Sequence, residues 1–238
     1  MRFLKLVLFL LVLAPIAHAQ TVDDVIGGYV KYIGGSKKWT SAKTIISEGE
    51  YDYGGIVFPF TTYAKAPNLY KVIVPLNGKF YAQAFDGTEG WKVDGFKNET
   101  NPTPLSGPAA LQLANEADVE LIDVFVNYKA KGHTAVLEGK DTVDNTLCYK
   151  VTLTRKNGEK ETWFFNTTSH QPVMRIAVSR NVEMGGALLN THFSDYRDVS
   201  GLKIPFKTVS DANGQMILTV VVKKVVVNAP VDSKIFQP

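Results

Sequence analysis

The sequence has few of the residues on which covalent or metal chemistry depends. Cys148 is the only cysteine, so no disulfide can form within the chain and the packed core must hold the fold. The motifs G-x-S-x-G, H-E-x-x-H and C-x-x-C and a phosphate-binding glycine loop are all absent, and the histidines are scattered at His18, His133, His170 and His192. We therefore expect no catalytic residues, no metal site and no cofactor, and a protein that is not an enzyme.

Net charge is also low. The formal charge is +3, and removing Arg2 and Lys5 from the N-terminal stretch leaves +1. Nucleic-acid-binding proteins concentrate Lys and Arg on one face. This balance gives no electrostatic reason to expect a nucleic-acid partner.

Long apolar runs are absent except at the N-terminus. Arg2 and Lys5 precede the apolar run from Leu6 to Ile16, and Ala17 to Ala19 matches a small-x-small cleavage site. The run is too short to span a bilayer. Residues 1–19 are therefore predicted to be a signal peptide cleaved after Ala19, with residues 20–238 forming one exported domain.

Strands organise the remainder, and the clearest group runs from Thr61 to Val93. Asn77-Gly78 predicts a two-residue type I′ hairpin turn, because both central residues must adopt positive φ. Turn signals recur about every 10 residues, which is typical of a β-sandwich or barrel. Alternating patterns predict strands at 43–53, 56–66, 69–74, 79–85, 90–93, 133–137, 146–155, 160–166, 173–180, 188–196, 204–210 and 216–227. Because proline removes a ladder hydrogen bond, the strands with Pro59 and Pro205 are predicted to lie at sheet edges.

Three helical or uncertain segments interrupt the strands. Val22 to Ile33 has one apolar face, is capped by Thr21, and contains Gly27-Gly28, which weaken it by roughly 1 kcal/mol each relative to alanine. It is interpreted either as a core-facing helix or as a lid. Pro108 to Asp118 is predicted to be a second helix, and Val119 to Asn127 to be helical or extended.

These features resemble the family of the periplasmic lipoprotein carrier LolA and its outer-membrane relative LolB. The segments Ala64–Lys71 and Ala84–Trp91 are similar to the K-R-P-N-x-x-R and D-G-x-x-x-W signatures of that family. Thr162–Asn166, Ser194–Arg197 and Gly201–Phe206 resemble its lipoprotein-sorting members. The resemblance implies a mainly β (α+β) fold, namely a half-open curved antiparallel β-barrel whose concave face is covered by short helices.

The function implied by the resemblance is sorting of lipoproteins to the outer membrane. A carrier of this kind is a periplasmic monomer that binds acyl chains of lipoproteins, receives them from an inner-membrane release complex and delivers them to an outer-membrane acceptor. One departure is Ala66, which stands where the family has an arginine that holds the lid. Lys65 points to the opposite face of its strand and is not an obvious replacement.

Candidate ligand-binding residues follow from the resemblance and from the apolar patterns. The expected cavity wall and lid residues are Val25, Ile26, Tyr29, Val30, Ile33, Phe80, Phe85, Trp91, Leu111, Leu113, Tyr149, Trp163 and Phe165. For each aromatic residue, plain core packing is an equally good interpretation. The alternatives in function are a periplasmic binder of other lipids or hydrophobic ligands, and a sensor or interaction module on the same scaffold.

Overall fold

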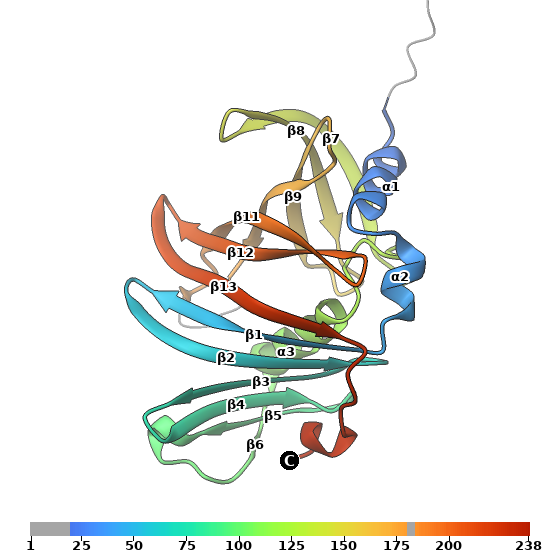
Figure 1. The fold of residues 1–238 in the computed structure, drawn as a ribbon. Coiled ribbons are helices and arrows are strands. Elements are labelled where there is room, and N and C mark those ends of the chain that lie inside the picture. Colours follow the sequence, from blue (N-terminus) through green and yellow to red (C-terminus); the bar gives the residue numbers. More distant parts are fainter. Residues whose placement is uncertain (1–19, 180–183) are drawn as a thin grey trace, which may run out of the picture.

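The computed structural model describes residues 20–179 and 184–238, and the predicted signal peptide lies outside the described residues. The described chain is mostly β: it forms one 13-stranded antiparallel sheet that curves strongly without closing (Figure 1). Three α-helices accompany the sheet, which confirms the predicted half-open architecture. Among the described residues, no helix combines the length and apolar character needed to cross a bilayer.

The elements follow one another in a simple order. The helices are α1 (Val22–Tyr32), α2 (Ser36–Ser41) and α3 (Gly107–Glu120), with 3-10 turns η1 (Gly95–Lys97) and η3 (Ser233–Phe236). The strands are β1 (Thr44–Tyr53), β2 (Ile56–Lys65), β3 (Leu69–Leu76), β4 (Lys79–Phe85), β5 (Gly90–Asp94), β6 (Thr103–Pro104), β7 (Thr134–Val143), β8 (Thr146–Thr154), β9 (Lys160–Asn166), β10 (Pro172–Val178), β11 (Leu188–Val199), β12 (Leu202–Ala212) and β13 (Gln215–Val227).

Two meanders make up this sheet. Strands β1 to β6 form one and β7 to β13 the other, each strand pairing with its neighbours in sequence. The β1–β13 ladder joins them, from Ile45 opposite Val227 to Asp52 opposite Thr219. Short turns explain this order: Asn77 and Gly78 have φ of 50° and 75°, as the predicted type I′ turn requires.

The predicted strands are confirmed as far as the described residues extend, one local expectation is wrong, and two short elements were not predicted. The sequence pattern did not indicate α2 or β6, which contain only 6 and 2 residues. The segment predicted to be helical or extended after α3 instead forms successive turns over residues 121–133.

The strands that contain the two prolines are interior rather than at edges. β2 lies between β1 and β3, and β12 lies between β11 and β13. Pro59 precedes the β2–β3 ladder, which begins at Thr61, and Pro205 precedes the β12–β13 ladder, which begins at Lys207. Each proline is therefore paired with a neighbouring strand on one side only, as at the edge of a sheet, where a residue without an N–H is tolerated.

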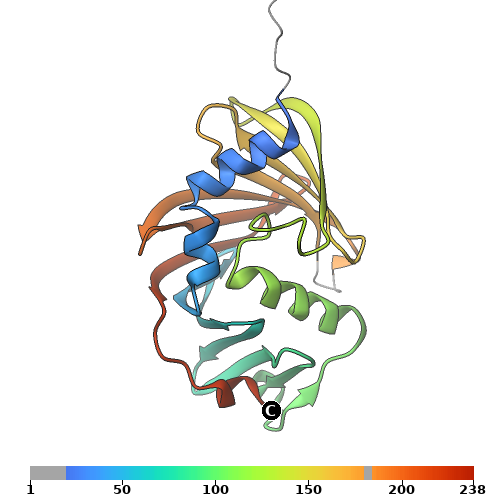
Figure 2. The ribbon, with the colours of Figure 1, turned by 90° about the vertical axis from the view of Figure 1, so that its right-hand side faces the viewer.

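The helices lie on the concave side of the sheet (Figure 2). α1 crosses the half formed by β7 to β9, where Val25, Leu153 and Phe165 are fully buried. The Tyr29 ring contacts the rings of Phe125 and Phe165, with centroids 5.6 and 5.0 Å away. α1 thus fills its half of the barrel as a core-facing helix, whereas α3 alone spans the other half.

The two glycines of α1 allow a matched test of this packing. A Cβ at Gly27 would meet nothing within 4 Å, whereas one at Gly28 would come within 2.4 Å of the His170 ring. We expect Gly27→Ala to raise the free energy of unfolding by about 0.5–1 kcal/mol through helix propensity. Gly28→Ala should lower it by about 1–3 kcal/mol through overpacking. Urea unfolding of both variants measures the difference; equal effects would contradict the packing of α1 on the turn that carries His170.

Candidate functional site

A hollow lies between α3 and the concave face of the sheet. It consists of two adjoining cavities of about 580 and about 380 Å³, which we call the outer and the inner cavity. They share the side chains of Tyr51, Tyr70, Glu120, Arg175, Thr208 and Val220. Both volumes fall in the range of small-molecule sites, so the concave half under α3 is a binding cavity in shape.

The inner cavity is mainly apolar, although Glu120, Asp123, Arg155 and Arg175 also line it. Its wall includes Trp39 from α2, Trp163 from β9 and the aliphatic side chains that β1, β12 and β13 turn inward. The apolar lining residues are Trp39, Ile45, Phe60, Val124, Trp163, Phe193, Ile204, Pro205, Val220 and Val222. Alternation along each strand places these side chains on one face of the sheet, where no helix covers them fully.

The outer cavity is mixed in character. Four tyrosines, Tyr51, Tyr53, Tyr70 and Tyr81, line it together with Gln83. From α3 come Gln112, Glu116 and Glu120, which are spaced four residues apart and so share one side of the helix. An apolar pocket thus opens into a chamber that offers hydroxyl, amide and carboxylate groups.

Exposed apolar side chains gather around the outer end of the hollow. The β1–β2, β3–β4 and β12–β13 turns all lie at this end of the sheet (left in Figure 1). Large apolar side chains are exposed at or near these turns, just after β5, at the end of β10 and at the start of β11. They are Tyr53, Ile56, Val57, Phe80, Phe96, Val178, Leu188 and Met216. Tyr53 and Phe96 also line the outer cavity, so the hollow opens toward this apolar rim.

Glu120 is the most perturbed carboxyl group of the hollow. Its side chain is exposed, and it faces the space of the cavity. Loss of bulk solvation, reinforced by repulsion from Glu116, raises the pKa of Glu120 to about 7. Its carboxylate is therefore poised to change charge near neutral pH.

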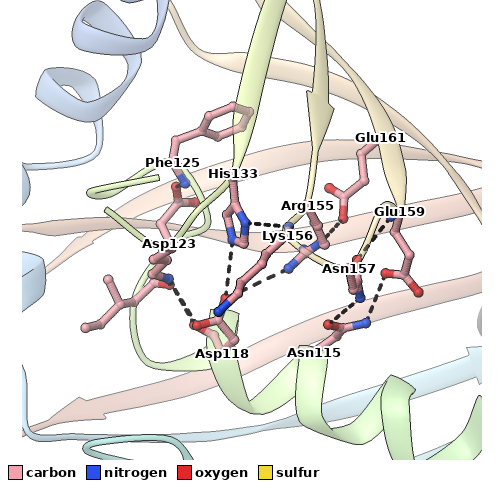
Figure 3. A network of polar contacts seen from close by, with 12 residues as sticks. Asn115, Asp118, Asp123, Phe125, His133, Arg155, Lys156, Asn157, Glu159 and Glu161 are labelled. Atoms are coloured by element: carbon pink, nitrogen blue, oxygen red, sulfur yellow. Dashed lines mark hydrogen bonds and ion pairs between the residues drawn. The ribbon is translucent and has the colours of Figure 1, made fainter. Parts of the chain in front are cut away.

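Polar contacts hold the C-terminal part of α3 to the sheet and the following turns (Figure 3). The Asp118 carboxylate lies 3.4 Å from Lys131 Nζ, 3.8 Å from His133 Nε2 and 4.0 Å from Arg155 Nη1. Arg155 Nε in turn donates to Glu161 Oε1 at 2.7 Å, in a pair that is almost fully buried. This network positions α3 over the hollow.

Ala66 stands where the LolA family has a lid-holding arginine, so other contacts hold α1. The Tyr29 hydroxyl donates to Asp123 Oδ2 at 2.5 Å, and the Tyr128 hydroxyl donates to Asp23 Oδ1 at 2.8 Å. Lys129 also pairs with Asp23, at 2.7 Å. α1 is thus tied to the turns after α3, so the two helices are linked through residues 121–133.

The side chain of Lys65, the neighbour of Ala66, points to the convex side of the sheet and binds the C-terminal segment there. Its Nζ donates to Val231 O at 2.6 Å and to Ser233 Oγ at 2.7 Å. The sequence-based expectation that Lys65 cannot replace the lid-holding arginine therefore agrees with its placement.

The predicted ligand-binding residues occupy several places. Trp163 lines the inner cavity, Ile26 and Val30 line a groove of about 680 Å³ between α1 and residues 125–130, and Leu111 lines pockets at the side of α3. Seven are packed in the core: Val25, Tyr29, Ile33, Phe85, Leu113, Tyr149 and Phe165. Phe80 is exposed at the rim, while Trp91 packs elsewhere and donates from Nε1 to Phe236 O. Contact of these residues with a ligand stays a prediction.

Residues that the sequence analysis missed line the hollow at its centre. Tyr51, Tyr70 and Glu120 border both cavities; Tyr51 and Glu120 lie outside the motifs found in the sequence, and Tyr70 occupies a variable position of one of them. The available signal was the alternation of β1 and β3, which places Tyr51 and Tyr70 inward without showing that space remains beside them. Within residues 20–179 and 184–238, no group of three or more His, Cys, Asp or Glu side chains is arranged to hold a metal ion.

The raised pKa of Glu120 makes a pH-dependent contribution to stability. Because the folded-state pKa of Glu120 is about 7 and the ordinary pKa of a glutamate is 4.5, the folded protein binds more protons than the unfolded chain between these pH values. Stability from this group is therefore present at low pH and is lost as the pH rises through about 7. We expect Glu120→Gln to increase the free energy of unfolding at pH 8 and to change it little at pH 5. Denaturant titrations at both values measure this, with exposed Glu138→Gln as the control; an equal effect at both pH values would contradict the assignment.

Comparison with known proteins identifies the fold. No family model and no curated protein sequence matches the chain. Among solved structures, a DUF1329 family protein from Desulfovibrio piger is 15% identical, with a TM-score of 0.61 over 92% of this chain and 98% of the other. A LolA superfamily protein from Nitrosomonas europaea is 12% identical, with a TM-score of 0.59 over 92% and 99%. A domain described as an outer membrane lipoprotein-sorting protein, from Vibrio parahaemolyticus, is 9% identical, with a TM-score of 0.59 over 90% and 95%. At these identities the likeness concerns architecture, and the chain has a LolA-like fold.

Proposed function

We propose that the protein is an exported, periplasmic carrier that binds the acyl chains of lipoproteins in the hollow under α3. The solved structures with the same fold include a LolA superfamily protein and a lipoprotein-sorting domain, which supports this class of ligand. The inner-membrane release complex and the outer-membrane acceptor implied by the sequence resemblance belong to the same proposal, as does a monomeric state.

The observation that carries the proposal is the incomplete filling of the concave face. Over β7 to β9, α1 buries its apolar side and leaves a solid core. Over β1, β12 and β13, the inner cavity remains open and is walled by aliphatic and aromatic side chains. Packed interiors contain few voids larger than a water molecule. A cavity of about 380 Å³ continuous with another of about 580 Å³ is therefore a site for a guest.

The energetics explain why the covering helices matter. Burial of each methylene contributes about 0.8 kcal/mol, so a long acyl chain is bound readily and released slowly. α3 is held by Leu113 and Ala117, which are packed in the core, and by the polar contacts of Asp118 and of Asn115, whose Nδ2 donates to Glu159 at 3.0 Å. A guest that displaces α3 must break these contacts. Their loss offsets part of the gain from the tail and moderates affinity.

The mixed lining of the outer cavity favours a second candidate, a periplasmic binder of other lipids. Gln83, Gln112 and the tyrosine hydroxyls offer polar groups to a guest that is only partly apolar. Native mass spectrometry of protein purified from a periplasmic extract distinguishes the two functions. Acylated peptides or lipoproteins in the spectra would support the carrier, and free lipids would support the general binder.

Filling the junction of the two cavities should abolish binding of a lipid tail. Thr208 lines both cavities, whereas Thr219, on the strand paired with it, points to the opposite face. We expect Thr208→Trp to weaken binding of a fluorescent fatty acid by tenfold or more, about 1.4 kcal/mol or above. Thr219→Trp should leave it unchanged. Fluorescence titration measures both affinities, and urea unfolding confirms that each variant is folded. Unaltered binding by folded Thr208→Trp would refute the hollow as the lipid site.

A further inference from the structure

Three hairpin turns at the outer end of the hollow carry strongly exposed apolar side chains. The β1–β2, β3–β4 and β12–β13 turns, at residues 54–55, 77–78 and 213–214, lie at the same end of the sheet (left in Figure 1). Beside them, Ile56 is 63% exposed, Met216 54% and Phe80 45%. We call residues 52–57, 75–80 and 211–216 the turn tips. A gathering of exposed apolar side chains on a folded domain marks a surface that contacts a membrane or another protein.

The charged side chains of the turn tips are engaged within the protein. The tips contain three of them, Asp52, Lys79 and Asp211. Asp52 and Asp211 each accept a hydrogen bond from the N–H of the glycine three residues further on, at 2.6 and 3.2 Å. Lys79 Nζ donates to Asn98 Oδ1 at 2.9 Å. The surface that the tips present is therefore mainly apolar, and its contact with a partner does not depend on charge.

Aromatic rings connect the turn tips with the inner cavity. The half-exposed ring of Tyr53 has its centroid 6.5 Å from that of Tyr51, and the Tyr51 ring stacks on Phe60 at 4.3 Å. Tyr53 lines the outer cavity, Tyr51 lines both cavities and Phe60 lines the inner one. An acyl chain that enters between the tips thus meets ring surfaces from the mouth of the hollow to the inner cavity.

The form of the turn tips fits a lipid surface better than a protein partner. Each tip is the closed end of a hairpin whose two strands pair with each other, so it offers no free edge for strand addition. The three hairpins end as separate projections (Figure 1), around which a fluid surface can deform. The guest of the proposed function also resides in a membrane, because each methylene moved into water costs about 0.8 kcal/mol.

We infer that the turn tips insert into the surface of a lipid bilayer, where the hollow opens to take up or release a tail. The apolar side chains hold the contact by lying at the boundary between head groups and acyl chains. Binding therefore needs neither anionic lipid nor low salt. This inference rests on the proposed function, because it names the surface with which the hollow exchanges its guest.

Flotation with vesicles tests the inference. The full mature chain is mixed with vesicles of dioleoylphosphatidylcholine, alone or with anionic dioleoylphosphatidylglycerol, and the fraction that floats with the lipid is measured. Raising the salt from about 0.1 M to about 1 M shortens the Debye length from about 10 to about 3 Å, which weakens contacts between exposed charges. We expect the protein to bind dioleoylphosphatidylcholine vesicles at both salt concentrations.

Two matched double substitutions locate the contact. Ile56→Ser with Met216→Ser alters the turn tips, at positions outside the lining of the outer and inner cavities. Val136→Ser with Leu147→Ser removes side chains of similar exposure, 55% and 50%, from β7 and β8. We expect the first variant to bind vesicles about tenfold more weakly, a change of about 1.4 kcal/mol, and the second to bind like the wild type. Circular dichroism and urea unfolding confirm that both variants are folded.

The outcomes separate this inference from the proposed function. Absence of flotation, flotation that requires anionic lipid and low salt, or equal flotation of the two folded variants overturns membrane insertion. A dimer in sedimentation velocity that the Ile56 and Met216 variant abolishes, without flotation, assigns the tips to a second copy of the chain and also overturns it. Binding of a fluorescent fatty acid in the absence of vesicles tests the proposed function independently. Loss of both kinds of binding in the wild type overturns both.

Discussion

The curvature of a single sheet is the constraint on which the rest of the structure depends. Thirteen strands joined through the β1–β13 ladder create a concave face too large for the three helices to cover. α1 packs a broad apolar side against β7 to β9 and forms a solid core with this half of the sheet. α3 lies across the other half and presents Glu116 and Glu120 to it. α3 buries Leu113 and Ala117 in the core but directs Gln112, Glu116 and Glu120 toward the hollow, so large apolar side chains do not fill this part of the concave face.

Both covering helices bury apolar side chains along their length, and polar contacts add to this packing near their ends. The contacts of Asp118 fasten α3 near its C-terminus, and those of Tyr29 and Asp23 fasten α1 to the turns that follow α3. Most of these pairs include a partly exposed group, and exposed ion pairs contribute little each. The buried pair of Arg155 and Glu161 is costly to break by removal of one member, and it belongs to the sheet. The arrangement therefore combines a rigid wall with covering helices whose individual polar contacts are weak.

The sequence predicted the sheet well because turns and strand alternation are local. Asn77-Gly78 requires a tight turn whatever surrounds it, and period-two patterns mark which side chains face inward. The hollow could not be predicted in this way. An inward residue such as Tyr51 or Val220 has the same pattern whether a helix or empty space lies beyond it. Likewise, Pro59 and Pro205 indicated missing ladder bonds correctly, but only the register shows that these gaps lie within interior strands. α2 is too short to display helical periodicity.

A mixed lining changes what a lipid site can distinguish. Burial of hydrocarbon depends on the area removed from water, so a wholly apolar pocket separates guests by tail size alone. Polar groups in a desolvated chamber act differently, because each one left without a partner costs free energy that a complementary guest recovers. Glu120 illustrates the cost: its pKa of about 7 shows that the surroundings oppose its charge. A charged group bound at the junction of the two cavities would therefore shift the pKa of Glu120, downward for a cation and upward for an anion.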